Sequence, residues 1–321
     1  MVKVRTVFDL DPKEMRIVYN DALCKAAAAN DRVVAINCDL CSSLGLKGFV
    51  KDFPDRSVNV GIQEANACSM AGGMSAAGMI PFFNTFSVFA TRRAYDQIFM
   101  CAAYPKLNVK IVGGDAGVSA TSNGGTHMPF EDMGILRVMP GVTVMEPSDG
   151  VMLADLIQQM VDTYGVQYIR FTRKNAVRIY EEGSHFEIGK AVTVRDGKDA
   201  TIITCGILVA EALKAAQMLA AEGINVRVVD MFTLKPIDAD CILRCAAQTG
   251  AIVTAENHQL MGGLFSAVSE VLAENGVGVP MEKIGIHDEF GEVGDQDYLM
   301  ERFQLSAPHI AAAVRKAVAR K

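Results

Sequence analysis

Several features that would identify a class of protein are missing from this chain of 321 residues. It has no excess of basic residues: 31 Lys and Arg stand against 37 Asp and Glu, a formal net charge of −6. No nucleic-acid partner is expected, because a basic surface is needed to hold a phosphate backbone. No apolar run reaches the roughly 18 residues typical of a transmembrane helix, so no membrane association is expected.

The start of the chain and its cysteines both indicate the cytoplasm. Basic residues near the N-terminus are not followed by an apolar stretch, so no secretory signal is expected. The eight cysteines lie mostly in apolar stretches, which is typical of buried free thiols in a reduced cytosol. Cys38 and Cys41 have the CxxC spacing, but no second pair completes a zinc site and no metal is assigned to this chain. We expect a cytoplasmic protein.

Short apolar runs and helical patterns alternate along the chain, as they do in α/β proteins. Residues 33–37 form a nearly continuous apolar run, as expected for a parallel strand covered on both faces. Residues 11–14 (DPKE) have the composition of a helix start and predict a helix that runs to about residue 30. Further strands are predicted at 58–60, 109–112, 142–145 and 168–172, and helices at 64–77, 91–103 and 150–164.

A charged stretch at residues 176–188 interrupts this pattern and predicts a domain boundary. A second set of elements follows, with strands at 200–205, 226–230 and 251–255 and helices at 207–222, from 237, at 264–274 and at 307–319. A prior of about 150 residues per domain agrees with two domains. The sequence therefore predicts two doubly wound α/β domains, over residues 1–180 and 188–321.

Glu64 is the first candidate functional residue. It follows a predicted strand and precedes a stretch of small residues, so its carboxylate can approach a ligand closely. A buried carboxylate at this turn favours a hydrogen bond shared with a ring nitrogen. The alternative is an ordinary glutamate that interacts with a helix N-terminus, and the spacing alone favours that alternative.

Three further stretches carry candidate residues. Phe86 and Phe89 share a face if their segment is helical, and they form either an aromatic wall or part of the core. His127 lies in a glycine-rich loop and is the best candidate acid or base among the histidines. Arg170 and Arg173 follow a strand, where an arginine fork can grip a phosphate or simply form a solvated cluster.

The order and spacing of these segments resemble transketolase. The segments are GIQEA, TFSVFATRRAYDQ, SNGGTHMPFEDMGILRVMPGVTVMEPSD and RFTRKN, followed by AENH and a Gly-Gly pair at 255–263. Residues 61–173 are similar to the pyrimidine-binding domain of that family, and the remainder is similar to its C-terminal domain. The resemblance implies a thiamine diphosphate-binding (pyrimidine) fold followed by a transketolase C-terminal-like domain.

The resemblance also implies which residues hold the cofactor. Glu64 matches the glutamate that bonds N1′ of the thiamine diphosphate aminopyrimidine and thereby activates the thiazolium carbon, so it is both catalytic and cofactor-binding. Phe86 and Phe89 match the aromatic residues that pack on the aminopyrimidine. Asp39 matches an aspartate near the thiazolium, and Arg92 falls where some transketolases have tyrosine.

For the substrate, the resemblance implies a phosphate end and a hydroxyl end. His127 matches a catalytic histidine that faces the sugar hydroxyls, and Arg173 matches the arginine that grips the sugar phosphate. Arg16 and Ser43 match a second phosphate arginine and a serine. The implied reaction moves a two-carbon ketol unit from a ketose phosphate to an aldose phosphate, as in the pentose phosphate pathway.

Two substrate-binding positions depart from the family pattern. Asn123 stands where many transketolases have an aspartate, and Asp115 stands where a histidine is usual. An alternative is therefore a split transketolase that acts on a non-standard sugar phosphate or on a sulfosugar.

The family's metal-binding Gly-Asp-Gly motif is absent from the sequence. The resemblance therefore implies that an N-terminal transketolase subunit holds the diphosphate and its Mg²⁺ or Ca²⁺. We expect this chain to self-associate into a dimer core and to work in a heterotetramer with that partner.

Three alternatives remain open at this point. The beta subunit of a 2-oxo acid dehydrogenase has the same length, layout and glutamate, but it has no sugar phosphate to bind. Deoxyxylulose-phosphate synthase would need a chain about twice as long. A regulatory remnant of the fold has no physical need to retain Glu64, Phe86, Phe89 and His127 together.

Overall fold

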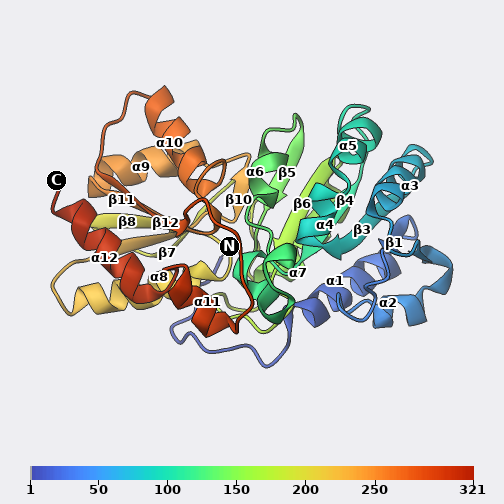
Figure 1. Cartoon of the computed structure of the whole chain (residues 1–321), viewed down its shortest axis with the longest axis horizontal. Helices are drawn as coiled ribbons and strands as arrows, with labels where there is room; N and C mark the ends of the chain where they lie inside the picture. The colour runs from blue at the N-terminus through green and yellow to red at the C-terminus, as the bar shows by residue number, and fades with distance from the viewer. Residues whose placement is uncertain (1) are drawn as a thin grey trace.

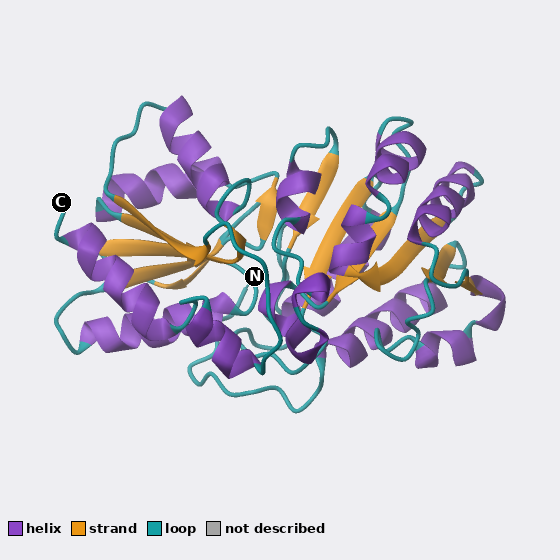
Figure 2. Ribbon diagram, viewed as in Figure 1, coloured by secondary structure: helices purple, strands orange, loops and turns teal. Residues whose placement is uncertain are grey.

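Two β-sheets with helices on both faces form two α/β domains that lie side by side in the computed structural model, which describes residues 2–321 (Figures 1 and 2). The first sheet has seven strands in the order β10-β5-β6-β4-β3-β1-β2, and the second has five in the order β12-β11-β8-β9-β7. This arrangement confirms the predicted fold class. No helix in residues 2–321 combines the length and the apolar character needed to cross a membrane.

The elements of the first domain have the following bounds. Its strands are β1 (Val33–Asn37), β2 (Ser57–Asn59), β3 (Ile80–Phe86), β4 (Lys110–Gly114), β5 (Val142–Met145), β6 (Val166–Phe171) and β10 (Thr233–Lys235). Its helices are α1 (Met15–Ala29), α2 (Lys47–Asp52), α3 (Glu64–Ala76), α4 (Ser87–Arg92), α5 (Tyr95–Ile98), α6 (Asp132–Arg137) and α7 (Gly150–Asp162). In Figure 1, α1, α2 and α7 lie on one face of the sheet and α3, α4 and α5 on the other.

The second domain is smaller. Its strands are β7 (Val192–Arg195), β8 (Ala200–Thr204), β9 (Val226–Asp230), β11 (Ile252–Gln259) and β12 (Met281–Ile286). Its helices are α8 (Leu208–Ala220), α9 (Ala239–Thr249), α10 (Leu264–Glu274), α11 (Gln296–Arg302) and α12 (Ala307–Val318). Within the described residues, β7 is the one antiparallel strand of this sheet, where it pairs with β9.

Most predicted elements are confirmed, and the bounds of β1, β5, β9 and α10 agree to the residue. The first helix begins at Met15 instead of residue 11, because the Asp11 carboxylate accepts a hydrogen bond from the Lys13 N–H (2.9 Å) and closes a separate turn. The predicted helix at 91–103 is broken into α4, α5 and a π-helical turn, Phe99–Ala103. Strand β3 was not predicted, although all seven of its residues are buried.

Chain segments cross between the two domains. Strand β10 follows β9 in the second half of the chain, yet it pairs antiparallel with β5 at the edge of the first sheet. The stretch at 176–188 is also not a free linker, because Val177 and Tyr180 pair with Leu10 and Val4 near the N-terminus. The two domains therefore share backbone hydrogen bonds as well as side-chain contacts.

Arg170 forms a buried polar cluster in the first domain that also contacts the second domain. Its guanidinium is fully buried and donates to Asp132 (2.7 Å) and Glu146 (2.8 Å), both buried carboxylates. It also donates to the backbone oxygens of Pro129 (3.2 Å) and, in the second domain, Asn257 (3.0 Å). Burying these charges is costly, so the arrangement is stable only because the opposite charges are paired and hydrogen-bonded.

The substitution Arg170→Met tests this cluster. It leaves two buried carboxylates without their cation, and we expect a loss of about 3–5 kcal/mol in the free energy of unfolding, measured by urea denaturation. Arg178→Met is the matched control, because Arg178 forms a solvent-exposed ion pair with Asp9 and should change the unfolding midpoint little. Equal midpoints for the two variants would contradict the assignment.

Candidate active site

The predicted site residues gather at one edge of the first sheet, where its parallel strands end. This is the edge at which open α/β sheets bind ligands. Three residues that follow strands have left-handed backbone conformations: Asp39 (φ 62°), Gly61 (φ 74°) and Asp115 (φ 63°). The side-chain oxygen of Asn59 accepts hydrogen bonds from the N–H groups of Asp39 (3.0 Å) and Gly61 (3.1 Å), which fixes the turns after β1 and β2.

Glu64 is the first residue of α3, and it is only 3% exposed. Its Oε1 accepts a hydrogen bond from the Thr85 hydroxyl (3.2 Å), and Arg93 Nη1 lies 3.3 Å and 3.2 Å from its two oxygens. Burial, reinforced by the Glu64 charge, raises the pKa of the neighbouring Cys38 thiol to about 12. Glu64 is thus a buried carboxyl group at the sheet edge, with side-chain partners from another segment.

An aromatic wall stands beside this carboxylate. Phe86 ends β3 and Phe89 lies in α4, and their ring centroids are 6.2 Å apart. The His127 ring packs edge-on against both, at 6.1 Å from Phe86 and 5.2 Å from Phe89. Its Nδ1 is 3.0 Å from the Thr126 hydroxyl. The structure therefore brings together the carboxylate, the aromatic pair and the histidine that the sequence singled out separately.

A charged cluster lies against the Phe86 ring. The Arg173 guanidinium lies over the Phe86 ring (4.8 Å to its centroid), and its Nε donates to Asp115 (2.6 Å). Asp115 is 1% exposed, and its Oδ2 has no hydrogen-bond partner within the described residues. Burial raises the pKa of the Asp115 carboxyl, while Arg173 opposes this rise.

The second predicted arginine belongs to the same cluster. Arg16 donates to the Glu14 carboxylate (2.6 Å) and approaches the Ser43 backbone oxygen (3.5 Å). Its backbone N–H donates to the Arg173 carbonyl (3.3 Å), so the two arginines are held together. Lys174 lies 3.8 Å from Glu14. Arg16, Ser43, Arg173 and Asp115 thus form one cluster although they are far apart in the sequence.

Two of the expected site residues are not part of these contacts. Arg92 is paired with Glu131 and donates to the Met128 backbone oxygen (3.3 Å), away from Glu64. Asn123 is exposed at the end of the short helix Gly117–Asn123. The expectation that Arg170 could grip a phosphate was wrong, because its guanidinium is buried and committed to Asp132 and Glu146.

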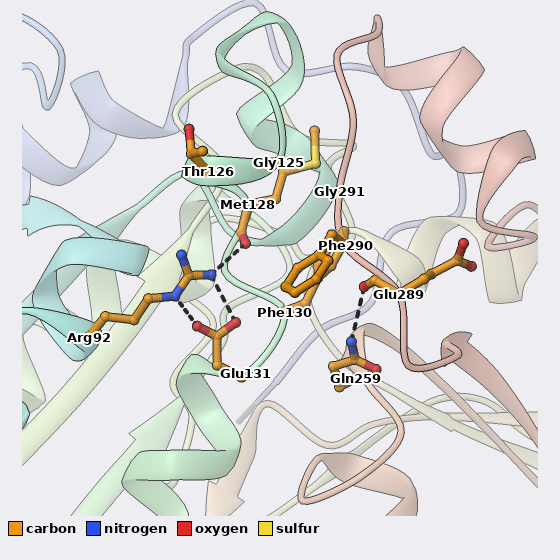
Figure 3. Close-up of a pocket in the computed structure, with 10 residues that line it drawn as sticks. All are labelled: Arg92, Gly125, Thr126, Met128, Phe130, Glu131, Gln259, Glu289, Phe290 and Gly291. Atoms are coloured by element: carbon orange, nitrogen blue, oxygen red, sulfur yellow. Dashed lines mark hydrogen bonds and ion pairs between the residues drawn. The ribbon is translucent and has the colours of Figure 1, made fainter.

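The Arg92–Glu131 pair forms one wall of a cleft of about 660 Å³ (Figure 3). The cleft lies between the loop that follows His127 and a loop of the second domain, where Phe290 is 94% exposed. Across it, the Gln259 side chain donates to the Glu289 backbone oxygen (3.2 Å). Figure 3 shows Phe290 and Phe130 facing the cleft beside the ion pair.

Sequence reasoning missed two residues that contact Glu64. Thr85 precedes Phe86 at the end of the unpredicted strand β3. Arg93 follows Phe89 by four residues, a spacing that places side chains on one face of a helix, and its guanidinium lies 3.8 Å from the Phe89 ring centroid. That spacing was a signal for Arg93, but its approach to Glu64 depends on contacts between distant segments.

The described residues contain no group of three or more His, Cys, Asp and Glu side chains able to hold a metal ion.

Comparison with protein families matches residues 11–178 to the transketolase pyrimidine-binding domain and residues 189–310 to the transketolase C-terminal domain. The chain therefore belongs to the transketolase family. Because the members of this family are transferases, the chain is part of a transferase.

Relatives with assigned names fall into two groups by length. The chain is 46% identical to the 6-deoxy-6-sulfo-D-fructose transketolase subunit SqwH of a Clostridium species, over 97% of both chains. It is 38% identical to a putative transketolase C-terminal section of Methanocaldococcus jannaschii, over 98% of both. Human transketolase is 37% identical over 94% of this chain, which spans only 48% of the human protein.

Solved structures agree with the family assignment. A chain described as a split gene transketolase, inactive beta4 tetramer, superposes with a TM-score of 0.89 at 40% identity, over 96% of this chain and 99% of that one. Transketolase from Leishmania mexicana superposes with a TM-score of 0.82 at 22% identity and supports the fold. That superposition covers 98% of this chain and 46% of the Leishmania chain.

Two glycines test how tightly the site is packed. A Cβ on Gly114, which ends β4, would lie 2.4 Å from Leu44 Cδ2 and 3.4 Å from Arg173 Cγ. We expect Gly114→Ala to lower the free energy of unfolding by about 1–3 kcal/mol and to displace Arg173. Gly73→Ala, at an exposed position in α3 with nothing within 4 Å, should raise stability by about 0.5–1 kcal/mol. A stable Gly114→Ala variant in thermal denaturation would contradict this packing.

Proposed function

We propose that this chain is the C-terminal subunit of a split transketolase that moves a two-carbon ketol unit between sugars. The observation that supports this most directly is the buried Glu64 carboxylate, which lies beside an aromatic wall at the carboxyl edge of a parallel sheet. A carboxylate in such a place, already hydrogen-bonded by Thr85, suits a ligand that presents a flat ring with a hydrogen-bonding nitrogen.

These residues fit the aminopyrimidine half of thiamine diphosphate. Glu64 would bond the ring nitrogen, and Phe86 and Phe89 would pack against the ring. When bound, the cofactor would supply the nucleophilic carbon and the electron sink for ketol transfer. His127 would face the sugar hydroxyls, where an imidazole can donate or accept a proton near neutral pH. Asp39, exposed at the turn after β1, would lie toward the thiazolium end of the site.

The rest of the cofactor requires a partner chain. This chain lacks the Gly-Asp-Gly motif, and the described residues offer no metal-binding group of side chains. We infer that an N-terminal-half subunit holds the diphosphate and its Mg²⁺ or Ca²⁺. The tetramer of the split gene relative supports self-association of chains of this kind, and we propose a heterotetramer with a dimer of this chain at its core.

The charged cluster supports a substrate with a terminal anion, which favours transketolase over a 2-oxo acid dehydrogenase subunit. Arg173 and Arg16 are each already paired with a carboxylate, from Asp115 and Glu14 respectively. A phosphate monoester carries about −1.5 to −2 charges at pH 7, whereas a sulfonate carries one. This charge balance, together with the sulfo-fructose relative, favours a sulfonated ketose over a phosphorylated one as the donor.

Glu64→Gln in the complex reconstituted with the N-terminal-half subunit tests the role of the carboxylate. Gln keeps the side-chain volume but cannot act as an acid toward the ring nitrogen, so we expect kcat to fall by about 10²-fold or more. The complex should still assemble, as monitored by size-exclusion chromatography. Unchanged turnover would mean that this chain has a non-catalytic role.

The choice of donor is tested by comparing kcat/KM for 6-deoxy-6-sulfofructose and xylulose 5-phosphate, with ribose 5-phosphate as acceptor. We expect the wild-type complex to prefer the sulfonated ketose. Asp115→Asn removes one negative charge beside Arg173, so it should lower KM for xylulose 5-phosphate more than for the sulfonated ketose. A wild-type preference for xylulose 5-phosphate that Asp115→Asn leaves unchanged would contradict the charge argument.

A further inference from the structure

The Arg93 side chain lies between the Glu64 carboxylate and the Phe89 ring. Its Nη1 is 3.3 Å and 3.2 Å from the two Glu64 oxygens, and its Cζ is 3.8 Å from the Phe89 ring centroid. The guanidinium is flat and charged, so it can stack on an aromatic face while it donates to a carboxylate. Arg93 thus makes the same two contacts, with the Glu64 carboxylate and the Phe89 ring, that the proposed function assigns to the aminopyrimidine ring.

We propose that Arg93 is a stand-in for the cofactor ring: its guanidinium occupies the position of that ring and must move away before the ring binds. The proposal rests on the proposed function, because it requires Glu64 and Phe89 to be the groups that hold the aminopyrimidine. Two planar groups cannot occupy the same face of Phe89 and the same carboxylate oxygens at once. Arg93 and the cofactor ring therefore compete for one position.

The burial of the two partners explains why such a stand-in is useful. The Glu64 side chain is 2% exposed, and within residues 2–321 Thr85 supplies its one other side-chain hydrogen bond. Burying a carboxylate charge without an opposite charge is costly, so a nearby cation stabilises this site. Arg93 provides that cation, and the stacking on Phe89 covers a ring that would otherwise face water.

The exposure of Arg93 makes the movement possible. Its side chain is 46% exposed, so the guanidinium can swing into solvent without repacking the core. The adjacent Arg92 has a different position, because Glu131 and the Met128 carbonyl hold it on the wall of the cleft. The two neighbouring arginines therefore differ: Arg92 is bound to the loop after His127, whereas the Arg93 guanidinium can move away from Glu64.

The test is the affinity of the reconstituted complex for thiamine diphosphate, measured by isothermal titration calorimetry at a fixed Mg²⁺ concentration. Arg93→Met removes the competing cation and keeps an unbranched apolar side chain. We expect Kd to decrease by roughly three- to tenfold, in line with the strength of a half-exposed ion pair and a cation–π contact. Lys283→Met is the matched control, since Lys283 is an exposed cation over Phe265 (4.8 Å) in the second domain, and it should leave Kd unchanged.

A double-mutant cycle separates this proposal from the proposed function. In the Glu64→Gln background the anion that attracts Arg93 is gone, so adding Arg93→Met should change Kd by less than about twofold. If Glu64→Gln weakens binding or turnover but Arg93→Met leaves Kd unchanged or raises it, the stand-in is wrong and the proposed function stands. If Glu64→Gln changes neither binding nor turnover, the proposed function fails and the stand-in fails with it.

Discussion

The buried Arg170 guanidinium determines much of this architecture, because it pairs with two carboxylates of the first domain, donates to the Asn257 carbonyl of the second (3.0 Å) and holds the loop that follows His127. The guanidinium binds Asp132 and Glu146 and donates to the Pro129 carbonyl, two residues beyond His127. Tyr168 donates to the second oxygen of Asp132 (2.5 Å), so this carboxylate is held from two sides. The position of the catalytic histidine candidate therefore depends on buried charges in the first domain.

The candidate site lies at the ends of the strands of the first sheet. The carboxyl ends of the parallel strands meet at one edge, and left-handed turns at Asp39, Gly61 and Asp115 let the chain change direction there. Glu64 and the aromatic wall form an end suited to a planar ring, and the Arg173–Asp115 pair forms an end suited to an anion. Phe86 contacts both ends, because its ring lies near Phe89 and Arg173 lies over it.

The sequence was sufficient for the fold class, and it named most of the residues that the structure brings together at this edge of the sheet. The strands β1, β5 and β9 could be predicted because they are short apolar runs bounded by clear turns. Strand β3 escaped prediction because Pro81 and Asn84 interrupt its pattern. Asn84 is buried there only because it donates to the Ile36 carbonyl (3.1 Å) and bonds Tyr19, contacts that no local pattern records.

The two neighbouring arginines show where sequence reasoning stops. Arg92 was assigned to the cofactor site by its place in the motif, but the structure pairs it with Glu131. Arg93 reaches Glu64 instead, because consecutive residues on a helix point in directions about 100° apart. Which of two adjacent side chains meets a distant carboxylate is decided by how α4 packs on β3 and β4, and how α3 packs on β3.

The central claim is that this chain carries only part of a cofactor site, which a partner subunit completes. Calorimetric titration of thiamine diphosphate and Mg²⁺ into this chain, with and without the N-terminal-half subunit, tests the claim most directly. The account predicts saturable binding near one cofactor per pair of subunits, and no saturable binding to this chain alone over the same concentration range. Saturable binding of one cofactor per chain without the partner would contradict it.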